Sequence, residues 1–75
     1  MKLSKAQLKA LEAVDAAEKQ SGREMYQTYR EIRSSTMSKL VSMGLVQIVS
    51  LGLLLPGLVT TETGRKALEE ARNGK

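Results

Sequence analysis

Residues 34–46, SSTMSKLVSMGLV, and residues 59–68, VTTETGRKAL, decide how this chain folds. The first stretch predicts a short helix over about residues 35–43 that stops at Gly44 and leads into a strand, because glycine readily takes the left-handed conformation that ends helices. The second stretch predicts a strand that ends in threonines suited to cap a new helix. The C-terminal half is therefore expected to run helix, strand, turn, strand, helix.

The segment between these two stretches admits two interpretations. Residues 40–61 contain no charged side chain, and a run of this length suffices to cross a bilayer, so a single-pass membrane peptide is one alternative. Polar residues and glycines interrupt the run, however, and Pro56-Gly57 is a turn signal preceded by β-branched residues. We expect two antiparallel strands, residues 45–50 and 58–60, around a turn at Pro56-Gly57.

The N-terminal half is predicted to be helical. Ser4 and Gln7 form a capping-box pattern at the start of a helix over residues 5–20. Gly22 is expected to end that helix in the left-handed conformation. A second helix is expected over about residues 24–33, because apolar residues recur there at helical spacing.

The boundary between the second and third helices rests on two serines. No glycine or proline separates them, so a single helix over residues 24–43 satisfies the same periodicity. Ser34 and Ser35 compete locally for backbone hydrogen bonds and favour a helix start. We therefore expect a break at about residue 34.

The third helix is expected to have one apolar and one polar face. At about 100° per residue, Leu40 and Val41 lie within about 60° of Met37 and predict the inner face. The opposite face is small, polar and weakly basic, and it consists of Ser35, Ser38, Lys39 and Ser42.

The composition is that of one small globular domain spanning residues 1–75. Hydrophobic residues make up 41% of the chain, and Phe and Trp are absent, so the core is expected to be largely aliphatic. A last helix is predicted from Thr61 or Glu62 to about Arg72, with residues 73–75 as a frayed tail.

The charge and the missing residue types narrow the function. A net charge of +4 and a pI near 9.7 suit a polyanionic partner. Cysteine and histidine are both absent, which excludes disulfides and thiol chemistry and removes the usual general base and the commonest metal ligand. The sequence also has no glycine-rich phosphate loop. We expect no enzyme activity, metal site, cofactor or small-molecule ligand.

The layout resembles the winged helix-turn-helix DNA-binding domains of prokaryotic transcription regulators such as the MarR and PadR types. Their recognition helix ends in Leu-x-x-x-Gly-Leu-Val, which Leu40, Gly44, Leu45 and Val46 match, and residues 59–65 are similar to the Leu-Thr-x-x-Gly-Arg that follows their wing. Residues 25–32, MYQTYREI, also resemble the winged-helix tail of archaeal replication initiators. The resemblance implies a mainly α fold with a small β-hairpin, three helices before it and one after it.

The resemblance also implies double-stranded DNA as the partner and the third helix as the DNA-reading element. Serine hydroxyls can bond base edges or phosphates, and basic side chains can neutralise phosphates. An ordinary solvated helix face, and ion pairs of the nearby arginines with Glu24 and Glu31, are the alternatives. The candidate DNA-binding residues are Arg30, Arg33, Ser34, Ser35, Thr36, Ser38, Lys39 and Ser42.

The wing differs from one that contacts DNA. Residues 47–60 carry no Lys or Arg, and such a surface is better suited to another protein than to phosphate. The candidate dimer or partner surface consists of Leu51, Leu53, Leu54 and Leu55. We expect a cytoplasmic, homodimeric transcription regulator, and the main alternative is a winged-helix module that binds a protein through this wing.

Overall fold

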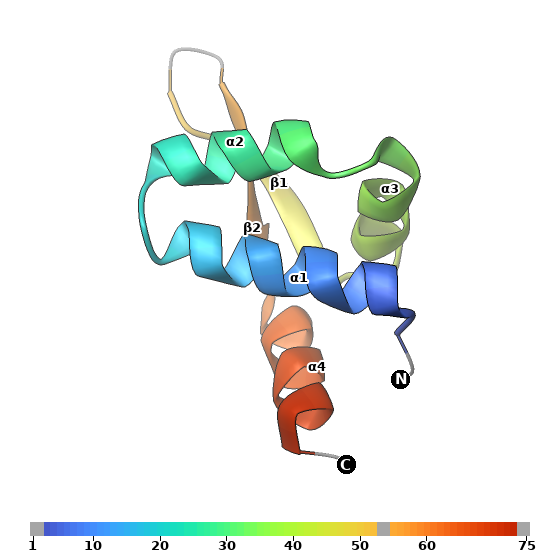
Figure 1. The fold of residues 1–75 in the computed structure, drawn as a ribbon. Helices are drawn as coiled ribbons and strands as arrows, with labels where there is room; N and C mark the ends of the chain where they lie inside the picture. Colours follow the sequence, from blue (N-terminus) through green and yellow to red (C-terminus); the bar gives the residue numbers. More distant parts are fainter. Residues whose placement is uncertain (1–2, 53–54, 74–75) are drawn as a thin grey trace.

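The computed structural model describes residues 3–52 and 55–73. Within them the chain is mainly helical with a two-stranded antiparallel hairpin, in the predicted order. In Figure 1, α1 and α2 lie side by side in front of the hairpin, α3 lies beside one end of both, and α4 extends from the base of the hairpin. The elements are α1 (Lys5–Glu18), α2 (Gly22–Glu31), α3 (Ser34–Ser42), β1 (Val46–Ser50), β2 (Pro56–Thr60) and α4 (Glu62–Asn73).

The start of α1 confirms the predicted capping box. The Ser4 hydroxyl oxygen accepts from the Gln7 backbone N–H at 3.1 Å, and the Gln7 side-chain oxygen accepts from the Ser4 N–H at 3.1 Å. The prediction that Gly22 ends α1 is wrong, because Gly22 is the first residue of α2. Ser21 caps that helix instead, accepting from the Glu24 N–H at 3.3 Å, and the C-cap of α1 is Lys19 in the right-handed conformation.

The second and third helices are separate, as the two serines predicted. Ile32 and Arg33 have extended backbones with ψ of 135° and 137°. Ser34 is the first helical residue of α3, and the N-cap is Arg33, which makes no side-chain cap bond. The short extended link turns α3 away from α2 without any glycine or proline.

The hairpin pairs Val46 with Thr60 at its base and Ser50 with Pro56 at its far end. The predicted turn at Pro56-Gly57 is wrong, because both residues belong to β2. As the first residue of its strand, Pro56 is at a position where the missing N–H is tolerated. Beyond the paired strands, the Leu51 N–H donates to the Leu55 carbonyl at 2.8 Å.

The core is aliphatic, as the composition predicted. It lies where α1, α3, the base of the hairpin and α4 meet, whereas α2 has no fully buried residue. Asp15 on α1 is also buried, and its carboxylate pairs with Lys19 at 3.2 Å and with Arg72 on α4 at 3.7 Å. The core side chains are Leu11, Val14, Leu40, Leu45, Val46, Leu58 and Leu68.

The uncharged segment, residues 40–61, includes the end of α3 and both strands of the hairpin. Within residues 3–52 and 55–73, no helix combines the length and the apolar character that crossing a bilayer requires.

Candidate nucleic-acid interface

The orientation of α3 is fixed at the corner where it leads into β1. Gly44 ends the helix with a positive φ of 75°. The Gly44 N–H donates to the Val41 carbonyl at 3.0 Å, and the Leu45 N–H donates to the Leu40 carbonyl at 2.9 Å. These bonds satisfy carbonyl groups that the end of the helix leaves free, and they direct Leu45 into the core, where it is fully buried.

The start of α4 holds this corner from the other side. The Thr61 hydroxyl donates to the Gly44 carbonyl at 2.6 Å and accepts from the Gly64 N–H at 3.0 Å. The Thr61 N–H donates to the Leu45 carbonyl at 3.0 Å. A side chain at Gly64 would overlap the same Leu45 carbonyl oxygen. Gly44-Leu45 and Thr61–Gly64, far apart in the sequence, therefore form one joint.

A second joint connects the end of α1 to the base of β2. The Glu18 carboxylate accepts from both the Thr60 N–H and the Thr60 hydroxyl, each at 2.7 Å. The Arg65 guanidinium lies 3.4 Å from the Thr60 carbonyl oxygen. Thr60 is 4% exposed, so the carboxylate satisfies two donors that water could not easily reach.

The exposed side of α3 carries most of the polar residues that the sequence proposed for DNA. Leu40 is fully buried, and Thr36 is half-buried. The prediction that Val41 belongs to the inner face is wrong, because Val41 is 40% exposed. The buried face of α3 is therefore centred near Leu40 and Thr36, whereas the periodicity centred it on Met37. The exposed candidates on α3 are Ser34, Ser35, Ser38, Lys39 and Ser42.

The rotation of α3 opens a shallow groove between α3 and β1. Its apolar lining comes from Met37 and Val41 on α3 and from Ile48 on β1, which is 52% exposed. Sequence reasoning missed this groove, since it placed Val41 inside and read Ile48 only as a strand residue. The remaining lining residues are Ser34, Ser38 and Ser42.

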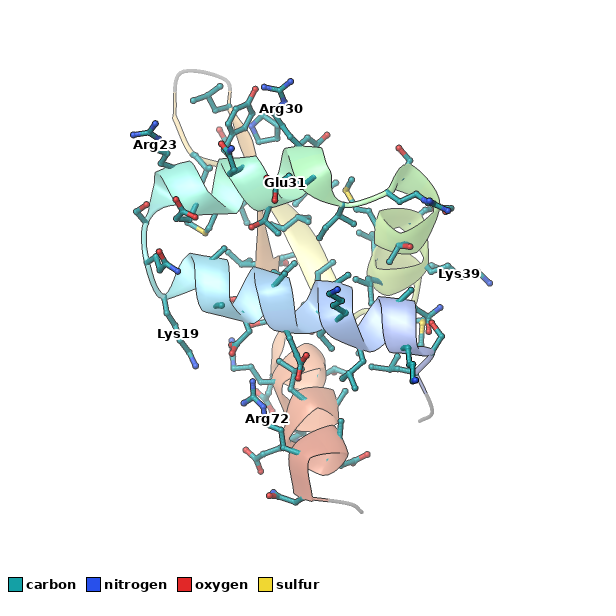
Figure 2. The ribbon with its side chains drawn as sticks, in the orientation of Figure 1. Lys19, Arg23, Arg30, Glu31, Lys39 and Arg72 are labelled. Carbon is teal, nitrogen blue, oxygen red and sulfur yellow. The ribbon has the colours of Figure 1, made fainter. Side chains whose placement is uncertain are left out.

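The basic candidates divide between two places. Lys39 extends outward from α3 at the edge of the molecule, whereas Arg30 lies beside α2, near the hairpin (Figure 2). The Arg30 guanidinium stacks over the Tyr26 ring at 5.9 Å from its centroid. Arg33 is exposed directly before α3. Lys39 and Arg33 therefore belong to the exposed side of α3, and Arg30 lies apart from Lys39.

The alternative in which the arginines form ion pairs with neighbouring glutamates is not realised in the described part of the chain. Its ion pairs join Asp15 to Lys19 and Arg72, and Glu62 to Lys66. Figure 2 places Glu31 on a different side of α2 from Arg30. Within residues 3–52 and 55–73, the arginines on and after α2 therefore form no direct ion pair with a carboxylate.

The structure describes two of the four leucines predicted to form a partner surface. Leu51 is half-buried, and its side chain occupies the space beside Gly57 where a side chain would otherwise lie. Leu55 is 40% exposed. Leu53 and Leu54 lie outside the described residues.

Comparison with known proteins gives no relative: the chain matches no family model, no curated protein and no solved structure.

Proposed function

We propose that this chain is a winged helix-turn-helix protein that binds double-stranded DNA, with α3 as the recognition helix. The observation that carries this proposal is the charge of α3 and of the chain segment that contains it. Residues 32–61 contain Arg33 and Lys39 and no Asp or Glu. An α-helix fits the major groove of B-DNA, and a helix face with hydroxyls and a cation but no carboxylate suits a polyanion.

The two ends of α3 support the proposal in different ways. The N-cap residue Arg33 makes no side-chain cap bond, so the N–H groups of the first turn are available to a phosphate. The C-terminal end is held by the joint with α4, through the Thr61 hydroxyl and the Gly44 carbonyl. A helix held rigidly at one end, with its outer face exposed, can enter a groove without losing core contacts.

The roles of the candidate residues follow from their positions. Arg33 and Lys39 supply phosphate contacts, and Ser35, Ser38 and Ser42 supply short hydrogen-bonding groups toward base edges and phosphates. Serine lets the helix backbone approach the bases closely. Arg30, stacked on Tyr26, is at most a contact to the flanking backbone of the duplex.

The test is the salt dependence of binding to a mixed-sequence duplex. The logarithm of the binding constant should fall with the logarithm of the salt concentration, by about 0.9 per phosphate contact. Lys39→Ala should reduce this slope by about one. Lys9→Ala, which removes an exposed lysine from α1, serves as the matched control and should leave the slope unchanged. Equal slopes for Lys39→Ala and wild type would remove α3 from the DNA interface.

The second candidate function is a protein contact through the candidate partner surface of Leu51, Leu53, Leu54 and Leu55, the leucine wing. It is favoured by the exposure of Leu55 at 40% and by the absence of Lys and Arg from residues 47–60. In the simplest form the partner is a second copy of the chain, and the DNA-binding regulator is then a homodimer whose two α3 helices read half-sites about 34 Å apart.

A further inference from the structure

The groove between α3 and β1 is the least explained feature of the proposed interface. Two of its lining residues, Val41 and Ile48, are 40% and 52% exposed. Ile48 lies on the same face of β1 as the buried Val46, because strand side chains alternate, but it extends past the edge of the core. The side chains of Val41 and Ile48 are thus exposed to water next to the polar face of α3.

The arrangement around α3 indicates what could cover these side chains. At about 100° per residue, Lys39 points about 160° away from Val41, and the exposed serines lie between them. One flank of α3 is therefore cationic, the centre carries hydroxyls, and the other flank is apolar. Along the major groove, a duplex offers phosphates, hydrogen-bonding base edges and the C5-methyl groups of thymines.

A protein partner fits this surface less well. Close contact with an apolar protein surface would leave the hydroxyls of Ser38 and Ser42 without partners, which is costly once water is excluded. Base edges and phosphate oxygens supply the acceptors that these hydroxyls need. The absence of acidic residues from 32–61 also favours an anionic partner.

We propose that the groove formed by Met37, Val41 and Ile48 receives the C5-methyl group of a thymine in the major groove. This inference rests on the proposed function, in which α3 enters that groove. It predicts which base pair the site prefers. We expect an A·T pair opposite the C-terminal half of α3, with the methyl group of its thymine toward Val41. Burying one methyl group should tighten binding about 3- to 5-fold.

The experiment compares two duplexes of alternating A·T sequence, one with thymine and one with uracil at every thymine position. The substitution removes only the C5-methyl groups. Wild type should bind the thymine duplex at least about 3-fold more tightly, measured by fluorescence anisotropy at one salt concentration. Val41→Ala and Ile48→Ala should each bring this ratio toward one while leaving the salt slope unchanged.

Val49→Ala is the matched control, because it makes the same truncation as Val41→Ala but lies on the opposite face of β1 from Ile48. It should keep the wild-type ratio. Any effect of uracil on the duplex itself acts on all variants alike, so only the part of the ratio that Val41→Ala and Ile48→Ala lose and Val49→Ala keeps belongs to the groove. A thermal melt of each variant checks that it is folded. Salt-dependent binding with equal affinity for both duplexes would overturn the methyl pocket and leave the proposed function standing. Absence of salt-dependent binding to either duplex would overturn the proposed function and the pocket together.

Discussion

The two ends of the hairpin are held in different ways. At the base, Thr60 and Thr61 bond to Glu18 and Gly44, and α4 packs directly on the Leu45 carbonyl. At the far end, the described bonds join backbone groups of Leu51, Gly52 and Leu55. The base joins segments that are distant in the sequence, whereas the far end joins neighbours. The hydrogen bonds that join distant segments of the described chain therefore lie at the base of the hairpin.

This difference matters for the proposed interface because α3 ends at the base. Gly44 and Leu45 are the residues through which α4 holds the end of α3. The direction in which α3 presents Ser38 and Lys39 is consequently set by contacts that lie on the other side of the corner. Substitutions at the base should disturb both stability and presentation, and substitutions at the far end should disturb neither.

The largest effect is expected for Gly64→Ala. The new methyl group would overlap the Leu45 carbonyl oxygen, so α4 must move away from the corner. We expect a loss of about 3 kcal/mol in the free energy of unfolding, measured by urea denaturation.

Gly22→Ala is the matched control for that substitution. Gly22 also lies in the first turn of a helix, but nothing is within 4 Å of the added methyl group. Alanine restricts the unfolded chain, so this variant should be more stable than wild type by about 0.5 kcal/mol. Similar changes in both variants would contradict the close packing of α4 on the corner.

A smaller effect is expected for Glu18→Ala. This change removes the acceptor for the Thr60 N–H and hydroxyl, and leaving buried donors unpaired costs about 1–3 kcal/mol. Glu18→Gln keeps one side-chain oxygen and should lose about 1 kcal/mol or less. Glu12→Ala, an exposed position on the same helix, makes the same change without a bonding partner and should stay within about 0.5 kcal/mol of wild type.

The sequence predicted the local features of this fold well. Ser4 and Gln7 form their capping box within a single turn, and Gly44 ends α3 by its own conformational freedom. The order of helices and strands follows from such signals because each depends on a few neighbouring residues. Gly22 was misread because Ser21, directly before it, is the stronger signal as an N-cap.

The contacts between distant segments could not be predicted in this way. Nothing in the sequence indicates that Glu18 and Thr60 are partners, since their contact depends on how α1 crosses the hairpin. Periodicity likewise indicates that α3 has an apolar face but not how the helix is rotated, so Val41 was placed in the core and the groove with Ile48 was missed. The sequence predicted the candidate site on α3, but only the structure shows the apolar groove beside it.

The smallest effect on stability is expected at the far end of the hairpin. Leu55 is 40% exposed, so Leu55→Asp should change the free energy of unfolding by no more than about 0.5 kcal/mol.

If the leucine wing joins two copies, the same variant should sediment as a monomer where the wild type sediments as a dimer, because a charge at the interface cannot be buried without a partner. Gln47→Asp adds the same charge at an exposed position of β1 closer to the base. This variant should sediment as a dimer, like the wild type. A wild type that sediments as a monomer at tens of micromolar would eliminate the homodimer. The opposite result, a stable Leu55→Asp monomer from a dimeric wild type, would assign folding to the base of the hairpin and association to its far end.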